Sequence, residues 1–201
     1  MKAPHIVNPR TSLSHPLHIA TLPIGAGAVG VTFCPGKQGD SVFGAPWARD
    51  VGLDLDVIQA WGAAAVLTLV EGHEMISLGV PDLGERIVER GLQWHHLPIA
   101  DLNPRGPSFE AGWPAVAAQL HRVIADGGRV LVHCRGGLGR AGTVAACLLI
   151  ELGEAPGTAI RRVRAARPHA IETAAQERYV LGHKPSRLPP KSESRHTHGL
   201  V

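Results

Sequence analysis

One short segment of the sequence combines a thiol, glycines and an arginine in an order that suits phosphate chemistry. The apolar run Val130–His133 has the length of a strand and leads straight into Cys134, and the apolar run 141–152 after Arg140 has the length of a helix. Glycines between a strand and a helix let successive backbone N–H groups point into one concavity, which binds an anion. The same positive potential favours the thiolate of Cys134, a nucleophile. Arg140 can fork around two oxygens of a tetrahedral dianion.

This segment predicts transfer of a phosphoryl group to sulfur by a mechanism that needs neither a metal nor a cofactor. Cys134 and Arg140 are the predicted catalytic residues of the loop. Other phosphate-binding loops do not fit, because the chain has no Gly-Lys-Ser/Thr and this segment has no Gly-x-Gly-x-x-Gly. Chance would produce His-Cys-x5-Arg with these glycines in only roughly 10⁻⁴ of such sequences. The phosphate contacts are expected from Arg135, Gly136, Gly137, Leu138, Gly139 and Arg140.

The stretch 133–140, His-Cys-x5-Arg, resembles the active-site loop of the cysteine-dependent protein tyrosine phosphatases, in particular their small dual-specificity branch. Together with the stretches 95–101 and 144–149, it is similar to the cyclin-dependent-kinase-associated phosphatase subfamily. The resemblance extends over about residues 22–183. It implies a four- or five-stranded sheet flanked by helices, and hydrolysis of phosphomonoesters through a cysteinyl-phosphate intermediate.

Asp101 is the predicted general acid, which protonates the leaving oxygen and then acts as the base that activates water. It follows the run Gln93–Ala100, a predicted parallel strand, so it belongs at the same carboxyl edge of the sheet as Cys134. Its separation from Cys134 also fits the resemblance. His133 is expected either to orient the loop by hydrogen bonding or to pack within its strand. Gln176 stands where some relatives place a hydrolytic glutamine, although a surface position is favoured for it.

Position 141 departs from the family pattern. Relatives usually carry serine or threonine directly after the arginine, where the hydroxyl stabilises the cysteine as it leaves the phosphoenzyme, and this chain has Ala141. Thr143 lies roughly 200° further around a helix, so it is a poor substitute. We expect attack on phosphate to survive and breakdown of the intermediate to be slow.

Alternating strand and helix patterns predict an α/β fold, with a single central, mostly parallel sheet flanked by helices on both faces and a short N-terminal β pair. Continuous apolar runs predict buried strands, and apolar residues at helical spacing predict the helices. The β pair is expected at 17–24 and 29–33, and the other strands at 64–70, 93–100 and 130–133. Helices are expected at 53–61, 81–91, 113–124, 141–152, 155–167 and 173–181.

The chain of 201 residues, 44% hydrophobic and 18% charged, suits one globular domain. We predict a flexible N-terminus over 1–16, a phosphatase domain over 17–183 and a disordered basic tail over 184–201. Four bases and one acid beyond residue 183 account for the whole net charge of +3. The folded domain therefore lacks the excess of positive charge that a nucleic-acid groove requires.

Three cysteines are too few, and odd in number, for a disulfide scaffold, and the longest apolar run, 63–70, is too short to span a membrane. We therefore expect a cytoplasmic monomer without nucleic-acid or membrane partners. Its predicted substrate is a phosphorylated protein carrying phosphotyrosine or phosphoserine/threonine.

Two alternative functions remain open. An inositol phosphate or phosphoinositide phosphatase is favoured by Arg135 and by the arginines of 161–167, but Leu138 lies where lipid-directed relatives carry a basic residue. A phosphopeptide-binding module with weak or no turnover is favoured only by Ala141. Release of phosphate from an aryl phosphate separates the enzyme from the binding module.

Overall fold

The sheet at the centre of the molecule has five strands in the order β1–β2–β7–β5–β6, and only β1 is antiparallel to its neighbour. The computed structural model describes residues 8–41 and 44–185. The strands of the sheet are β1 (Ala20–Ile24), β2 (Gly27–Phe33), β5 (Ala63–Thr68), β6 (Gln93–His96) and β7 (Arg129–Cys134). A separate antiparallel ribbon joins β3 (Gln38–Gly39) to β4 (Trp47–Ala48). The predicted central, mostly parallel sheet is confirmed.

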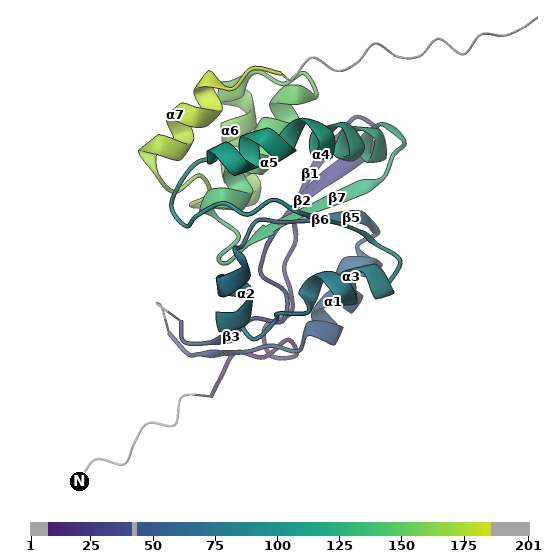
Figure 1. The fold of residues 1–201 in the computed structure, drawn as a ribbon, viewed down its shortest axis with the longest axis vertical. Coiled ribbons are helices and arrows are strands. Elements are labelled where there is room, and N and C mark those ends of the chain that lie inside the picture. The colour runs from purple at the N-terminus through teal and green to yellow at the C-terminus, as the bar shows by residue number, and fades with distance from the viewer. Residues whose placement is uncertain (1–7, 42–43, 186–201) are drawn as a thin grey trace, which may run out of the picture.

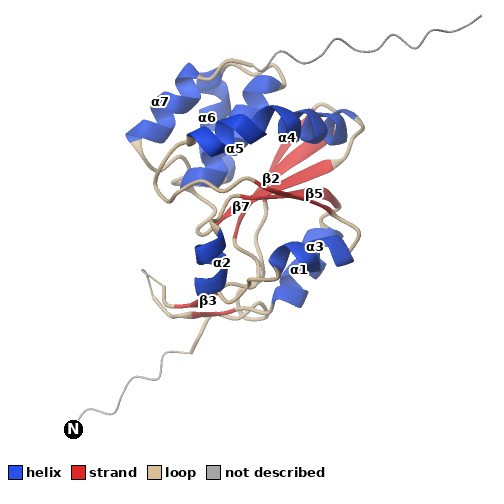
Figure 2. Ribbon diagram, in the orientation of Figure 1, coloured by secondary structure: helices blue, strands red, loops and turns tan. Residues whose placement is uncertain are grey.

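Helices cover both faces of this sheet, as predicted (Figures 1 and 2). The layer drawn above the sheet contains α4 (Pro107–Ala125), α5 (Gly139–Glu151), α6 (Pro156–Ala166) and α7 (Ala174–Gly182). The layer below it contains α1 (Val51–Ala60), α2 (Gly72–Ser77) and α3 (Leu83–Glu89). Parallel neighbours need a crossover connection, which places helices on the faces of the sheet.

The predicted N-terminal β pair is present as β1 and β2, and it belongs to the central sheet. The two strands pair antiparallel, while β2 also pairs parallel with β7, with Phe33 opposite Cys134. β2 is buried along nearly its whole length because it lies between two neighbours. The residues that follow β2 therefore lie beside the loop that follows β7.

Two short elements were not predicted, α2 and the β3–β4 ribbon. α2 has six residues, too few to show a helical period, although Glu71 and Glu74 form a capping box at its start. β6 ends at His96, earlier than predicted. Beyond it the N–H groups of Leu97 and Ile99 still donate to carbonyls of the β5 chain, at 3.1 and 3.0 Å, but Pro98 between them has no N–H.

The core has one layer on each face of the sheet. In β7, Val130 and Val132 pack toward α4 and α5, whereas Leu131 packs toward α1 and α3. Successive strand residues point to opposite faces, so a strand covered on both faces is apolar throughout. Every residue of α5 is buried, since this helix contacts β2 and β7 on one side and α6 and α7 on the other. α5 is thus the helix that carries the loop after β7.

Part of the predicted flexible N-terminus contacts the folded body. The Arg10 N–H donates to the Pro46 carbonyl at 2.8 Å, and the Ser12 hydroxyl donates to the Asp50 carbonyl at 3.2 Å. Residues 1–7 and most of the predicted tail, 186–201, lie outside the described residues. Among the residues that are described, no helix combines the length and the apolar character needed to cross a membrane.

Candidate active site

Cys134 is the last residue of β7, and the loop 135–138 closes over its sulfur before α5 begins. The Gly137 N–H donates to Cys134 Sγ at 3.2 Å, and Cys134 is only 3% exposed. The sulfur thus sits at the base of a backbone cup, with the first turn of a helix directly above it. An anion bound in this cup would face backbone N–H groups and the positive end of α5.

The three loop glycines differ in how closely their surroundings approach them, and only Gly137 meets backbone atoms. Gly137 has φ +68°, and a Cβ there would lie 2.4 Å from the backbone carbon of Thr32. A Cβ at Gly139 would lie 2.4 Å from Glu172 Oε2. At Gly136 a Cβ would meet nothing within 4 Å. The loop is therefore packed tightly against β2 and the segment before α7, and open at its tip.

Arg167 holds the loop from outside. Its Nε donates to the Gly137 carbonyl at 3.2 Å and its Nη2 to the Gly136 carbonyl at 3.3 Å. In a trans peptide the carbonyl and the N–H point in opposite directions. Carbonyls that point outward to Arg167 leave the following N–H groups directed toward the interior of the cup.

Arg140 is buried and held by α2. Its Nη1 and Nη2 donate to the two carboxylate oxygens of Glu74 at 2.6 and 2.9 Å, and Nη1 also donates to the Ile99 carbonyl at 2.9 Å. Burial alone would lower the pKa of Arg140, but the hydrogen bonds to Glu74 raise it above its ordinary value. Burial likewise opposes ionisation of Glu74, and the bonds from Arg140 outweigh it, so the pKa of Glu74 is lowered. The pair is charged, rigid and oriented before any substrate binds.

Asp101 lies on the same guanidinium. Its Oδ1 is 3.0 Å from Arg140 Nη2, and its side chain is 59% exposed. Glu74, Ile99 and Asp101 together occupy both Nη groups, while Nε has no partner among the described residues. A phosphoryl group that takes two N–H bonds from Arg140 must therefore displace Asp101, which is free to turn toward the leaving oxygen.

These residues open onto a cleft of about 390 Å³. Cys134, Arg140 and Asp101 line it together, so the structure brings the three predicted catalytic residues into one site. Of the predicted phosphate contacts, Arg135, Gly136 and Leu138 also line the cleft. Further lining residues come from segments without a predicted role: Arg10, Lys37, Gln38, Trp47, Leu78 and Glu172.

His133 is fully buried in β7, behind the loop. Its Nε2 is 2.8 Å from Thr68 Oγ1, which also accepts a hydrogen bond from Trp94 Nε1 at 2.9 Å. Burial lowers the pKa of His133 to about 3, so the ring is neutral. It therefore holds the end of β7 against β5 and does not line the cleft.

Gln176 is fully buried, and the expectation of a surface position is wrong. Its Oε1 accepts from the Thr173 N–H at 3.2 Å, and its Nε2 donates to the Asn103 carbonyl at 3.1 Å. A Cβ at Gly139 would lie 2.8 Å from its Nε2. Gln176 thus caps α7, ties it to the Asp101 loop and packs against the start of α5.

The hydroxyl of Thr143 does not replace the one missing at position 141. Thr143 is buried and its Oγ1 donates to the Gly139 carbonyl at 2.8 Å. A hydroxyl has a single proton to donate, so none is left for the sulfur of Cys134. Ala141 itself is fully buried.

The other two thiols are buried away from this chemistry. Cys147 lies in the core on α5, and burial raises its pKa to about 12. Cys34 follows β2, and burial raises its pKa to about 12 as well. Both are protonated at neutral pH.

A sequence model described as "Swiss Army Knife protein, DSP-PTPase phosphatase domain" matches residues 52–180, which include the loop after β7. The chain belongs to this family. It is a cysteine-dependent phosphatase of the dual-specificity type, and the resemblance found in the sequence is confirmed.

The chain is also similar to individual phosphatases and to a kinase inhibitor protein. The chain is 30% identical over 172 residues to cyclin-dependent kinase inhibitor 3 of Homo sapiens, covering 82% of this chain and 77% of that protein. It matches a crystal structure of kinase-associated phosphatase with its catalytic-site cysteine changed to serine, at TM-score 0.72 and 28% identity, covering 82% of this chain and 92% of that one. A phosphatidylglycerophosphate phosphatase of Arabidopsis thaliana is 32% identical over 130 residues, 64% of this chain and 36% of that protein.

Several residues that shape the site of this phosphatase were not predicted from the sequence. Glu74 is separated from Arg140 by 66 residues and lies on a helix too short to predict. Lys37 directly precedes β3, and Trp47 is the first residue of β4, in the ribbon that was not predicted. Arg167, one of the arginines of 161–167, contacts the loop carbonyls. The capping pattern Glu71-x-x-Glu74 was the one available signal, and it indicated a helix start without indicating a partner.

Proposed function

We propose that this dual-specificity phosphatase hydrolyses phosphotyrosine and phosphoserine/threonine in a protein substrate, with Cys134 as nucleophile, Arg140 as phosphate ligand and Asp101 as general acid and base. The observation that carries the proposal is the position of Cys134 Sγ beneath the loop N–H groups, beside a buried arginine already oriented by Glu74.

In the first step the thiolate of Cys134 attacks phosphorus, and the bond from phosphorus to the substrate oxygen breaks. Asp101 gives its proton to that oxygen, so the substrate leaves as an alcohol or phenol. The loop N–H groups and the Arg140 N–H groups bind the phosphoryl oxygens as the charge moves. The products are the dephosphorylated alcohol or phenol and a phosphocysteine.

In the second step water attacks phosphorus, Asp101 takes a proton from it, and the bond from phosphorus to sulfur breaks. Inorganic phosphate and the thiolate of Cys134 are regenerated. Among the described residues the Gly137 N–H donates to the sulfur, so it stabilises the departing thiolate. This step is the slow one.

The test is release of phosphate from an aryl phosphate and from phosphotyrosine and phosphothreonine peptides. Cys134→Ser is expected to abolish turnover, and Arg140→Lys to lower it by about 10² or more, since lysine cannot make the bidentate contact. Cys147→Ser is the matched control and is expected to keep the activity. Turnover by Cys134→Ser near the parent level would remove Cys134 as the nucleophile.

An inositol phosphate or phosphoinositide is the second candidate substrate. It is supported by Arg135 at the mouth of the cleft and by the similarity to the phosphatidylglycerophosphate phosphatase. Leu138 lines the cleft where a further basic residue would favour such a substrate. A panel that compares phosphopeptides with inositol phosphates at equal concentration ranks the two.

We also propose that the enzyme acts as a monomer in the cytoplasm, on phosphorylated proteins and not on nucleic acids. One chain supplies Cys134, Arg140, Glu74 and Asp101, which supports the monomer. Cys34, Cys134 and Cys147 are all free thiols, which suits a reducing compartment. Sedimentation of the active enzyme tests the first point.

A further inference from the structure

Lys37 lies beside the catalytic loop, although 98 residues separate it from Arg135. Its side chain is 8% exposed and lines the same cleft as Cys134. Its Nζ donates to the Arg135 carbonyl at 3.4 Å, and the Cys34 N–H donates to the same oxygen at 3.4 Å. That carbonyl points away from the interior of the cup. The ammonium group therefore stands next to the place where the phosphoryl group binds and not inside it.

Two aromatic rings hold the ammonium group at this place. Lys37 Nζ is 4.2 Å from the centre of the Trp47 ring and 4.4 Å from that of Phe33. The Arg10 guanidinium lies 3.9 Å from the centre of the Trp47 ring. Ring faces attract cations, and they also exclude water from them. Two of the cations that line the cleft, Lys37 and Arg10, thus share the Trp47 ring.

No carboxylate of the described residues pairs with Lys37. Arg49, which lies over the same two rings, pairs with Asp54 at 2.8 Å. Burial lowers the pKa of Lys37 to about 8, so the group is still mainly charged at neutral pH. Burying a cation without a counter-charge costs free energy, and an anion that binds beside the cation lowers that cost.

The positions of the carboxylates in the cleft indicate which kind of ligand would bring an anion to Lys37. Asp101 contacts Arg140, and Glu172 lies against Gly139, before α7. Figure 1 shows α7 on the opposite face of the sheet from β3, the strand that follows Lys37. Asp40, the third carboxylate of the lining, is outside ion-pair distance of Lys37. A ligand with anions on every side, such as an inositol polyphosphate, would face Asp101 and Glu172.

A peptide with anionic groups on one side meets no such opposition. The apolar side chains of Leu78 and Leu102, which also line the cleft, suit the uncharged parts of a peptide. We propose that Lys37, with Arg10 beside it on Trp47, binds a second anionic side chain of the substrate. This inference rests on the proposed protein phosphatase activity. The enzyme then selects phosphopeptides in which an acidic or phosphorylated residue neighbours the residue being dephosphorylated.

The test compares phosphotyrosine peptides that differ at one position. Glutamate, phosphoserine or alanine is placed at each of the two positions before and after the phosphotyrosine. The readout is the ratio of kcat/KM for the anionic peptide to kcat/KM for its alanine counterpart, so a general change in activity cancels. At the position that reaches Lys37, the parent ratio is expected to be about ten, since the contact is charge-assisted and partly shielded.

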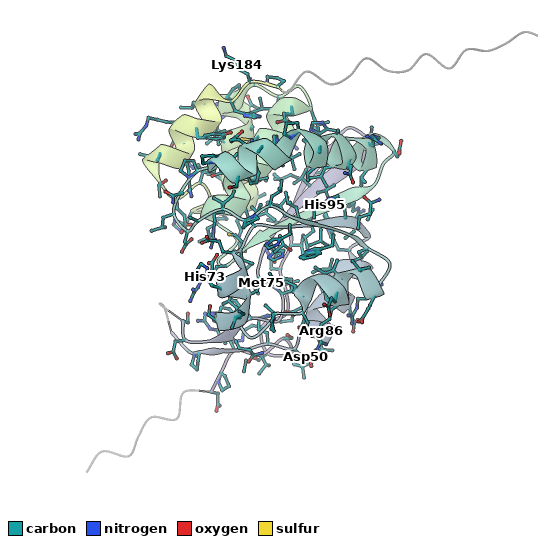
Figure 3. The ribbon with its side chains drawn as sticks, viewed as in Figure 1. Asp50, His73, Met75, Arg86, His95 and Lys184 are labelled. Atoms are coloured by element: carbon teal, nitrogen blue, oxygen red, sulfur yellow. The ribbon has the colours of Figure 1, made fainter. Side chains whose placement is uncertain are left out.

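Lys37→Met is expected to bring that ratio to within about twofold of one, mainly through KM. Lys37→Arg keeps the charge and is expected to retain most of the preference. Lys184→Met is the matched control: this exposed lysine lies beyond α7, far from α2 with His73 and Met75 (Figure 3), and its replacement is expected to leave the ratio unchanged. Raising the salt concentration is expected to lower the parent ratio and to leave that of Lys37→Met constant.

The proposal is overturned if the parent enzyme shows no preference at any of the four positions, or if Lys37→Met keeps it. A faster reaction of an inositol bisphosphate than of the best anionic peptide, lost in Lys37→Met, would also overturn the peptide as occupant. Loss of the proposed function itself gives a different result, since the enzyme would then release no phosphate from the alanine peptides either.

Discussion

At the scale of single residues, we expect the hydroxyl that is missing at position 141 to limit the rate. Ala141 follows the arginine where a hydroxyl would face the sulfur, and the Thr143 hydroxyl is used on the Gly139 carbonyl. The Gly137 N–H is then the donor bonded to Cys134 Sγ, at 3.2 Å. We expect the attacking step, which in the proposed mechanism depends on Arg140 and the loop, to be unaffected by this loss. We expect the departure of the thiolate to be affected directly.

We therefore expect a burst of phenol from an activated aryl phosphate, close to one equivalent per active site, followed by a slower linear phase. Ala141→Ser supplies a charge-assisted hydrogen bond worth about 1.5–3 kcal/mol. It is expected to speed the linear phase about tenfold or more, because about 1.36 kcal/mol corresponds to a tenfold rate. The burst rate is expected to change little. Stopped-flow absorbance measures both phases.

Ala141→Gly is a useful companion variant, because it alters the same buried position without adding a hydroxyl. Its linear phase is expected to be no faster than that of the parent. If the parent shows no burst and Ala141→Ser leaves both phases unchanged, the leaving thiolate already has another donor.

At the scale of elements, the catalytic loop depends on what surrounds it more than on its glycine content. β2 lies within 2.4 Å of the place where a Gly137 Cβ would be, and Arg167, the residue after α6, donates to two loop carbonyls. Gly136 has open space and an ordinary backbone conformation. Two glycines that look equivalent in the sequence therefore differ in how much the fold requires them.

Gly137→Ala is expected to move the loop off β2 and to lower kcat/KM by 10² or more, since small displacements of catalytic groups have effects of that size. Gly136→Ala, its matched control, is expected to stay within about threefold of the parent. Aryl phosphate kinetics and thermal unfolding of both variants measure this. Equal losses in the two variants would show that Gly136 also needs its freedom of conformation.

The elements that could be predicted are those with a period or a continuous apolar run. α4 shows one apolar stripe and β7 one buried run. β7 begins and ends within one residue of its prediction, whereas α4 begins at Pro107, six residues earlier than predicted. Cys134, Arg140 and Asp101 could be predicted to meet because parallel strands end at one edge. Glu74 and Lys37 could not, because they lie on or beside short elements whose positions depend on tertiary packing. Gln176 was misplaced because a capping residue is polar whether or not it is buried.

At the scale of the whole molecule, two buried titratable groups link stability to pH. His133 is neutral inside the fold, with its pKa lowered to about 3 by burial. Burial would raise the pKa of Glu151, but hydrogen bonds from His121, His183 and Trp113 outweigh it and lower that pKa to about 2. The two groups lie in different parts of the core, on β7 and at the end of α5.

The free energy of unfolding is expected to fall as the medium becomes acidic. The unfolded chain binds a proton on His133 below about pH 6.5 and the folded chain does not until about pH 3, so this contribution is full above 6.5 and lost on the way down. Through His133 alone, the free energy of unfolding changes by at most about 1.4 kcal/mol per pH unit. Glu151 adds a loss between its ordinary pKa of 4.5 and about 2.

Urea unfolding at pH 7, 6 and 5 measures the first of these losses. His133→Gln is expected to be less stable than the parent at pH 7 and to lose less stability between pH 7 and 5. His15→Gln, at an exposed position, is the control with the parent slope. Identical slopes for His133→Gln and the parent would remove His133 as the source.

The contact of Asp101 with Arg140 bears on how the enzyme releases its product. When inorganic phosphate leaves, Asp101 takes up the vacated Nη2 N–H, so the guanidinium exchanges one counter-ion for another and is never left bare. We therefore expect weak product inhibition, because each phosphate ion competes with a carboxylate tethered to the site. Asp101→Asn removes that competitor, and it is expected to turn over about 10²-fold more slowly while binding inorganic phosphate about threefold to tenfold more tightly. Isothermal titration with phosphate measures the second effect, and phosphate affinity that is unchanged in Asp101→Asn would show that the carboxylate does not compete.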